Sequence, residues 1–380
     1  MNFELTEERQ MLQDSLRRFL RDNQDALRAS TRLGNAENAL GFDAGIWGKL
    51  ADLGVVGALF SEEEGGFAGA GFDLTTVFEE LGRAGAVEPL LDTAILGGGL
   101  IAALGTDAQK ELVEQVIGGE LHLALAHGEP NSRYDLAQVE TTATVDGDDI
   151  VLTGRKAVVV NAEAADYLIV SARESGAAGD EEGISLFLVP RESAGVTLRG
   201  YALLAGGRAA EVDLDGLRLT AAARLGAAGA AYGALKRASN RAEVALAAET
   251  LGAMEAATEL TREYLLTRQQ FGRPIGSFQA LQHRMATLLI ELEQARSAVI
   301  NAAGHLDGSA SEQALQIAAA RNLVGRAGRL VAEESIQLHG GIAMTEEYEL
   351  AHIAKRIVMA DHRFGDTDTQ LERFLDQSAA

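Results

Sequence analysis

One segment of the chain ends a helical pattern abruptly, and a new helical pattern begins shortly after it. The segment reads Arg268-Gln269-Gln270-Phe271-Gly272-Arg273-Pro274-Ile275 and continues to Phe278-Gln279. Gly272 and Pro274 end the first pattern because neither residue type is favourable within a helix. An arginine beside such a turn can hold a phosphate bidentately, and the next helix N-terminus adds backbone donors. A simple helix–helix turn explains the same residues, so both interpretations stay open.

A second segment, further along the chain, contains paired glycines. It reads Gln337-Leu338-His339-Gly340-Gly341-Ile342-Ala343-Met344-Thr345. Gly340 and Gly341 let a backbone approach a ligand closely. Glycines in this position also end helices, so this segment alone does not establish a binding site.

Helical periodicity surrounds both segments from Gly226 to the C-terminus. The first segment ends a long helix that carries Leu246, Met254 and Leu260 on its apolar positions. We expect further helices over residues 277–303, 311–338, 346–362 and 367–377. Helices of this length bury their apolar faces against one another or against another subunit.

The middle of the chain has a strand pattern instead. Short apolar or alternating runs occur at residues 121–125, 141–145, 150–152, 158–160, 167–170, 184–189 and 212–219. Asp146-Gly147 is a hairpin signal between two of them. Short strands at this spacing predict an antiparallel barrel or sandwich.

The N-terminal part is predicted to be helical. Thr6 is placed as an N-cap ahead of Glu7 and Glu8, whose charges suit the positive end of a helix. Apolar residues around Trp47 and over 74–81 predict two further helices, with a loop over 62–71. The predicted domains are therefore an N-terminal α-helical domain at 1–120, a middle β-barrel at 121–224 and a C-terminal helical bundle at 225–380.

Composition narrows the class of protein. The chain of 380 residues has 33 Lys+Arg against 56 Asp+Glu, a net charge of −23, and 47% hydrophobic residues. These values predict a globular protein and argue against nucleic-acid or anionic-membrane partners. The absence of cysteine excludes disulfides, iron–sulfur clusters and thiolate zinc sites, and no histidine spacing indicates a metal site. Without a signal-peptide pattern at the N-terminus or an apolar run long enough to span a bilayer, we expect a cytoplasmic protein.

Taken together, the two segments resemble the acyl-CoA dehydrogenase family. That family has Arg-x-x-Phe-Gly, then Phe-Gln, then Gln-x-x-Gly-Gly, in the order found here. Leu5-Thr6-Glu7-Glu8, Leu53-Gly54, Glu64-Gly65-Gly66 and Leu152-Thr153-Gly154-Arg155-Lys156 match as well. The resemblance covers essentially the whole chain and is strongest to the small subunits of pimeloyl-CoA-type dehydrogenases. It implies the acyl-CoA dehydrogenase fold: an N-terminal all-α domain, a middle antiparallel β-barrel and a C-terminal four-helix bundle.

The resemblance also implies FAD, held between the barrel and the C-terminal helices and partly across a subunit contact. The residues it places at the cofactor come from four segments: Arg268, Gln270, Phe271 and Gln279 from one subunit; Gln337, Gly340 and Gly341 from another; Gly128 and Val160 from the barrel; Asp368 and Gln370 near the C-terminus. Further implied partners are an acyl-CoA substrate, an electron-transfer flavoprotein, and sister chains in a homotetramer or heterotetramer. Fatty-acid β-oxidation is the implied pathway type.

The family reaction needs a carboxylate that removes the α-proton of an acyl-CoA while the β-hydrogen leaves as hydride to flavin N5, which gives a trans-2-enoyl-CoA. In the family this base lies four residues before a Gln-hydrophobe-x-Arg run, which here is residues 370–373, so the resemblance points to Asp366. Asp is one methylene shorter than the usual Glu, a reach about 1.5 Å smaller. Asp366 also suits an N-cap of the last helix, and the two roles are compatible. Some members carry the base earlier in the chain, where Ala242 stands and Glu243 is adjacent.

Three departures from the family pattern lie in the predicted barrel. Gly128 precedes Glu129-Pro130 where a Thr is usual, a bulky turn fills 131–135, and Val158 and Val160 replace an aromatic residue and a Thr. These departures suggest weak FAD binding by the chain alone. One alternative function is therefore a catalytically weak partner subunit that completes a shared FAD site. An oxidase or monooxygenase is another, and Arg133 or Arg241 could meet a distal carboxylate of the acyl chain.

Overall fold

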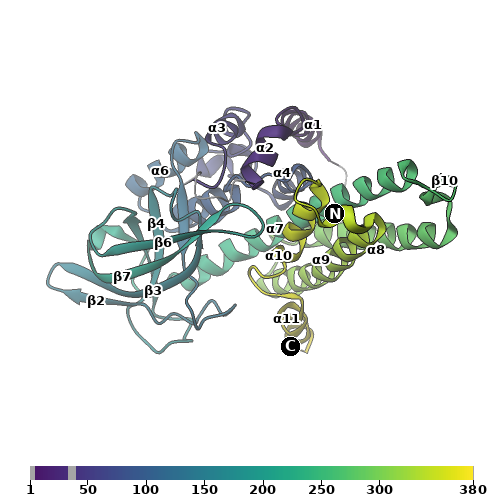
Figure 1. Cartoon of the computed structure of the whole chain (residues 1–380). Helices are drawn as coiled ribbons and strands as arrows, with labels where there is room; N and C mark the ends of the chain where they lie inside the picture. The colour runs from purple at the N-terminus through teal and green to yellow at the C-terminus, as the bar shows by residue number, and fades with distance from the viewer. Residues whose placement is uncertain (1–4, 33–39, 380) are drawn as a thin grey trace. The chain divides into compact units, whose positions relative to one another are not determined.

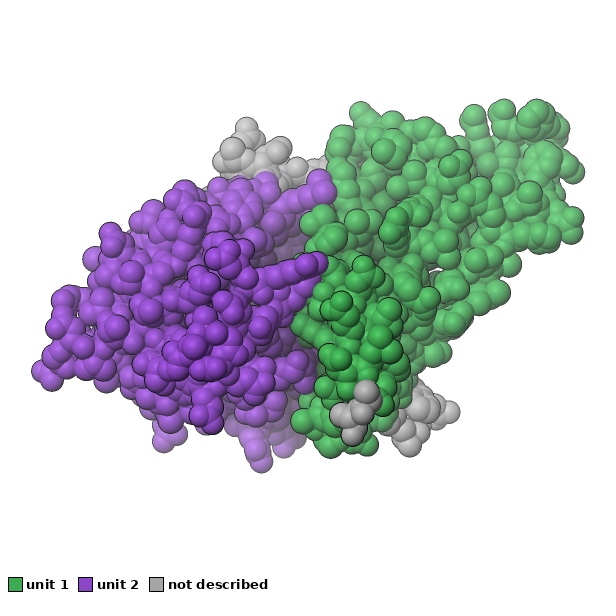
Figure 2. Space-filling model, turned by 90° about the horizontal axis from the view of Figure 1, so that it is seen from below, with its two compact units in different colours: residues 1–31, 70–86, 243–380 green, residues 32–69, 87–242 purple. Residues whose placement is uncertain are grey.

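Helices form both ends of the chain and strands form its middle in the computed structural model, which describes residues 5–32 and 40–379 (Figure 1). Residues 1–4 of the predicted N-terminal segment lie outside the described residues. The chain divides into two compact units, coloured separately in Figure 2. Unit 1 comprises residues 1–31, 70–86 and 243–380, and unit 2 comprises residues 32–69 and 87–242. Each unit thus joins distant parts of the sequence, and the division at residues 120 and 224 stays a prediction.

Unit 1 is helical. It contains α1 (Glu7–Asp22), α4 (Gly71–Ala84), α8 (Gln279–Gly304), α9 (Ala310–His339), α10 (Glu349–Ala360) and α11 (Thr367–Ala379), with most of α2 (Gln24–Arg32) and α7 (Tyr232–Thr267). Helix α9 packs against α8, α10 and α11, so it is central to the C-terminal bundle. The helices predicted over residues 277–377 are confirmed, with boundaries shifted by a few residues.

Local sequence signals explain where these helices begin and how closely they pack. The amide of Arg9 donates to Oγ1 of Thr6 at 3.3 Å, which confirms the predicted cap of α1. Gly252 of α7 lies against α4, where an added Cβ would be 1.9 Å from the carbonyl oxygen of Glu79. Glycine is therefore required for the two helix backbones to approach this closely.

Unit 2 is built on an eight-stranded sheet, in which seven strands follow the order β6-β7-β3-β2-β4-β5-β8 and β1 pairs with β4. The strands are β1 (Leu123–Ala126), β2 (Thr142–Asp146), β3 (Asp149–Val160), β4 (Tyr167–Arg173), β5 (Ile184–Pro190), β6 (Val196–Ala202), β7 (Arg208–Thr220) and β8 (Arg224–Leu225). Most neighbours are antiparallel, as predicted, whereas β1 and β2 each run parallel to β4. The two runs predicted at 150–152 and 158–160 are one strand, β3, interrupted by register shifts.

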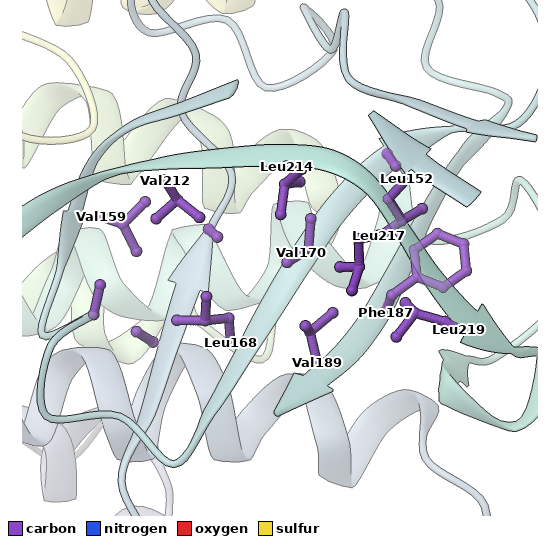
Figure 3. Close-up of a cluster of buried hydrophobic side chains, with 14 of the residues drawn as sticks. Leu152, Val159, Leu168, Val170, Phe187, Val189, Val212, Leu214, Leu217 and Leu219 are labelled. Carbon is purple, nitrogen blue, oxygen red and sulfur yellow. The ribbon is translucent and has the colours of Figure 1, made fainter. Parts of the chain in front are cut away.

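One face of this sheet carries a continuous apolar core (Figure 3). Leu152, Leu168, Phe187 and Val212 are fully buried and come from four strands. Alternation of side chains along each strand places these residues on a common face. The core therefore fixes the register of β3, β4, β5 and β7, and with it the loops that leave these strands.

Helices also accompany the sheet in unit 2. They are α3 (Ala44–Asp52), the short turns η1 (Gly57–Leu59) and η2 (Glu62–Glu64), the π-helical η3 (Leu91–Gly98), α5 (Gly99–Leu104) and α6 (Asp107–Ile117). An added Cβ at Gly97 would be 2.5 Å from Cβ of Leu123, and at Gly98 it would be 2.6 Å from the ring of Phe60. Gly97 and Gly98 are therefore positions where close packing leaves no room for a side chain. Among the described residues, every helix is too short or too polar to cross a membrane.

Candidate functional site

The first glycine-containing segment forms a tight β-hairpin after α7. Helix α7 ends at Thr267, earlier than the sequence predicted, because strand β9 (Gln269–Gln270) pairs with β10 (Arg273–Pro274). Phe271 is at the tip, with a φ of 54° and 90% exposure. The predicted contact residues Arg268, Gln270, Phe271 and Gln279 are all exposed. The hairpin therefore presents an aromatic ring and polar side chains to solvent.

The second segment follows the end of α9. Gln337 lies exposed in the last turn of this helix, and Gly340 follows with a φ of 70°. An added Cβ at Gly340 or Gly341 would meet no atom within 4 Å, so both glycines border open space. The ring of His339 stacks on Tyr264 of α7 at 4.4 Å. This contact places the paired glycines beside the last turn of the helix that precedes the hairpin.

Asp366 stands at the start of α11. Its Oδ1 accepts the amide of Thr369 at 2.9 Å, and its carbonyl oxygen accepts the amide of Gln370 at 2.9 Å. These bonds confirm the predicted N-cap. The residue is half-buried, and Asp368, the second residue of the helix, is exposed. A helix N-terminus favours negative charge, so the cap stabilises the anionic carboxylate that a proton-accepting role requires.

Glu243 and Gln370 are bound to each other in the interior of unit 1. Nε2 of Gln370 donates to Oε2 of Glu243 at 2.7 Å, and Nη1 of Arg373 lies 3.5 Å from Oε1. Glu243 is 2% exposed and Gln370 is 1% exposed. Both oxygens of Glu243 therefore face donors within the fold, which supports a structural role for this carboxylate.

In unit 2, a buried polar cluster holds the segment that contains Gly128. Nζ of Lys156 is 2.6 Å from Oε1 of Glu129 and donates to Oγ of Ser171 at 3.0 Å. Nδ1 of His127 contacts the same Ser171 oxygen at 2.9 Å. The carbonyl oxygen of Gly128 accepts the amide of Ala157 at 2.7 Å. The cluster ties the segment after β1 to strands β3 and β4.

Burial and charge shift the titration of this cluster. Burial, with the nearby ammonium of Lys156, lowers the pKa of His127 to about 3. Burial also lowers the pKa of Lys156 to about 8, although Glu129 opposes this shift. For Glu129, burial favours the neutral acid, but Lys156 and hydrogen bonds lower its pKa overall. His127 is thus neutral and the Lys156–Glu129 pair ionised at neutral pH.

Sequence reasoning did not identify this cluster. Lys156 was selected only as part of a family motif, Glu129 only as a neighbour of the missing Thr, and His127 was not selected. The signal that could have indicated it is a lysine at a buried position of an apolar strand, because such a lysine needs an internal partner.

Backbone strain marks several of the segments selected from the sequence. Among the described residues, the non-glycine residues with positive φ are Arg133, Val158, Asn161, Phe271 and Phe364. Val158 precedes the predicted contact residue Val160, Phe271 is at the hairpin tip, and Phe364 lies two residues before Asp366. Such conformations are costly for branched or bulky side chains and cluster at functional sites.

The side chain of Arg241 makes structural hydrogen bonds within unit 2. Its guanidinium donates to the carbonyl oxygens of Gly69 at 2.9 Å and Leu59 at 3.0 Å. The hypothesis that Arg241 meets a distal carboxylate of the substrate is therefore not supported by its contacts. Arg133 is exposed and lies 5.5 Å from the ring centroid of Tyr134.

Comparisons with known proteins agree with this architecture. Three family models match the chain: the N-terminal domain of acyl-CoA dehydrogenase at residues 6–120, its middle domain at 124–215 and its C-terminal domain at 233–378. Benzylmalonyl-CoA dehydrogenase from Aromatoleum aromaticum is 32% identical over 80% of both chains. Butyryl-CoA dehydrogenase from Megasphaera elsdenii has a similar structure, with a TM-score of 0.90, 25% identity and full coverage of both chains. The ChsE4–ChsE5 complex from Mycobacterium tuberculosis gives a TM-score of 0.86 at 26% identity, over 100% of this chain and 99% of that one.

The chain belongs to the acyl-CoA dehydrogenase family and has its fold. It is an oxidoreductase of that family.

Proposed function

We propose that the chain catalyses the FAD-dependent α,β-dehydrogenation of an acyl-CoA thioester to a trans-2-enoyl-CoA. The observation that carries the proposal is the position of the strained residues. Val158, Phe271 and Phe364 each adopt a positive φ, and each lies in a segment that the family resemblance assigns to the cofactor or the base. Strained residues of this kind persist only where the surrounding structure imposes them, and they cluster at functional sites.

The residues present in each unit suit FAD. In unit 1, the open space beside Gly340 and Gly341 gives room for a nucleotide against the backbone. The proposed contacts there are Arg268, Gln270, Phe271, Gln279, Gln337, Gly340, Gly341 and Asp368. Gln370, which the resemblance also places at the cofactor, is buried against Glu243 and is not among the proposed contacts. In unit 2 they are Gly128 and Val160. When bound, FAD supplies the hydride acceptor.

Asp366 is the proposed base. Removal of the α-proton of a thioester needs an anionic carboxylate and a site that stabilises the enolate. The Asp366 carboxylate meets the first requirement because it caps α11 through Oδ1. Donors to the thioester carbonyl and exclusion of water must meet the second requirement.

The test is the visible flavin absorption of the purified protein, recorded anaerobically before and after addition of a series of acyl-CoAs. We expect the flavin band to bleach with a competent substrate. Asp366→Asn should abolish bleaching and enoyl-CoA formation while flavin content stays unchanged. Asp376→Asn, at an exposed position on the same helix, is the matched control. Full turnover in Asp366→Asn would remove Asp366 from the mechanism.

A second candidate function is that of a partner subunit with little activity of its own. Three barrel departures favour it: the missing Thr before Glu129-Pro130, the bulky turn at 131–135, and the two valines Val158 and Val160. The similarity to the ChsE4–ChsE5 complex favours it as well. The same spectrum separates the two functions. A protein that is colourless alone and yellow only when co-expressed with a sister subunit would support the second. A yellow protein that bleaches alone would reject it.

The partners follow from the proposed reaction. We propose that electrons leave through an electron-transfer flavoprotein and that the chain assembles as a homotetramer or as a heterotetramer with a sister subunit. Rapid oxygen uptake with acyl-CoA, in the absence of the electron-transfer flavoprotein, would instead indicate an oxidase.

A further inference from the structure

The turn between α10 and α11 has an unusual backbone. Phe364 and Gly365 have consecutive positive φ values of 63° and 125°. Oγ1 of Thr367 donates to Oδ1 of Asp361 at 2.8 Å and closes the turn. A bulky residue stays in the left-handed region only if its surroundings impose that conformation. The side chains around the turn must therefore hold Phe364 in this conformation.

Arg321 of α9 binds the turn from one side. Its side chain is buried, and Nη2 donates to the carbonyl oxygens of Ala360 at 3.2 Å, Arg363 at 2.8 Å and Gly365 at 3.4 Å. A single cationic donor shared by three carbonyls constrains the path of the backbone between them. Charge-assisted hydrogen bonds of this type are stronger than neutral ones.

Glu243 of α7 acts on the turn through two other side chains. Nε2 of Gln370 donates to Glu243 and also lies 3.4 Å from the carbonyl oxygen of Phe364. Nη1 of Arg373 lies near the second oxygen of Glu243 and donates to the same Phe364 carbonyl at 2.9 Å. Glu243 thus orients two donors toward the strained residue.

Close packing restricts the turn further. An added Cβ at Gly325 of α9 would be 2.2 Å from Oγ1 of Thr367 and 2.5 Å from Oδ1 of Asp361. An added Cβ at Gly365 would be 2.9 Å from Nε2 of Gln370. The turn is in direct contact with α9 and with α11, so it cannot shift toward either helix.

We propose that Arg321 and Glu243 are positioning residues that hold the turn at 361–366 in one conformation and so fix the carboxylate of Asp366. This inference rests on the proposed function for the role of Asp366. The holding of the turn does not depend on it. Neither residue touches substrate in this proposal, and both act through the backbone of the turn.

The test compares Arg321→Met, Arg321→Lys and Glu243→Gln with the matched control Arg329→Met. Arg329 is on the same helix, but its side chain is 79% exposed and pairs with the exposed Glu333. Hydrogen exchange of the full-length protein, followed for residues 361–370, reports the turn without any need for activity. Enoyl-CoA formation gives kcat and KM in parallel, and the flavin spectrum gives cofactor content.

We expect exchange at residues 361–370 to accelerate by about tenfold in Arg321→Met and to stay unchanged in α8. The value of kcat should fall by roughly tenfold to a hundredfold, because a displacement of about 1 Å is sufficient for such a loss. KM and flavin content should change little, and Arg321→Lys should recover part of the loss. If Arg321→Met does not fold, Glu243→Gln provides the same comparison with the side-chain shape preserved.

The outcomes separate the two proposals. Unchanged exchange at 361–370 in Glu243→Gln and in the Arg321 variants would overturn the positioning role, whatever the activity. Faster exchange in the Arg321 and Glu243 variants would support the positioning role. If Asp366→Asn kept full turnover at the same time, Asp366 would be rejected as the base, but the role of Arg321 and Glu243 in holding the turn would stand. Loss of turnover in Asp366→Asn with normal kcat in all positioning variants would reject the link between the turn and catalysis.

Discussion

Nζ of Lys156 lies 2.6 Å from Oε1 of Glu129 inside unit 2, and the two side chains are 0% and 4% exposed. Transfer of both charges out of water is costly, and their attraction offsets this cost only with good geometry and further hydrogen bonds. The further bonds are present: Ser171 and the His127 carbonyl accept from Lys156, and the amides of Glu140 and Thr141 donate to Glu129. The pair therefore connects β3 to the segment that contains Gly128.

Removal of one partner of this ion pair should lower the free energy of unfolding more than removal of both partners. Lys156→Met leaves the Glu129 carboxylate buried without its cation, so we expect a loss of about 3–5 kcal/mol in the free energy of unfolding. Lys156→Met combined with Glu129→Gln should lose clearly less than the single variant. Urea unfolding of the four proteins in the cycle measures the coupling. A loss in the double variant equal to the sum of the two single losses would show that the charges do not interact.

His127 should make stability depend on pH. Its pKa is about 3 in the folded protein, against 6.5 for an unperturbed histidine. Because the folded-state pKa is lowered, the stabilising contribution is complete above pH 6.5 and is lost as the pH falls toward 3. Between pH 7 and pH 5 we expect a loss of about 2 kcal/mol from this residue.

The measurement is the difference in unfolding free energy between wild type and His127→Gln at the two pH values. The difference should move by that amount, in favour of the variant at pH 5. A difference that stays constant between pH 7 and pH 5 would contradict the buried, neutral state of His127.

Gly252 should not tolerate a side chain. The Cβ of Gly252→Ala would be placed 1.9 Å from the carbonyl oxygen of Glu79, so α4 and α7 would have to separate. We expect a loss of roughly 1–3 kcal/mol or more, the range for overpacked cores. Gly48→Ala is the control. Gly48 lies in helix α3, and an added Cβ there would meet no atom within 4 Å. That variant should gain about 0.5–1 kcal/mol, since alanine is the better helix former. Thermal unfolding of both variants checks the contrast.

Much of the fold was predictable because its signals are local. Thr6 caps α1 through a bond to a residue three positions away, and Gly272 and Pro274 permit the turn between α7 and α8. These residues are close together in the sequence, so a short sequence pattern is enough to predict where the helix begins or ends. The β6 strand was missed because its side chains alternate only weakly in burial and it contains Arg199 and Gly200.

The site was less predictable because its contacts connect distant parts of the chain. Arg321 binds carbonyls about forty positions away, and Glu243 binds Gln370 across most of the C-terminal half. No periodicity or spacing records such pairings. The family resemblance selected the turn at Asp366 and placed Gln370 at the cofactor, whereas the structure shows Gln370 buried against Glu243. Neither the sequence patterns nor the family resemblance predicted the polar cluster around Lys156.

Phe271 offers a test of whether strain is retained for binding. Its φ of 54° is unfavourable for a phenylalanine, and its ring is almost fully exposed. Phe271→Gly should raise the unfolding free energy of the protein without cofactor by about 1 kcal/mol, because glycine adopts this conformation freely. Phe271→Ala retains the strain and removes the ring, so it should not show this gain. Both variants should retain less FAD after gel filtration if the ring contacts the cofactor. A gain in stability with full FAD retention in Phe271→Gly would mean that the strained hairpin tip does not serve the cofactor site.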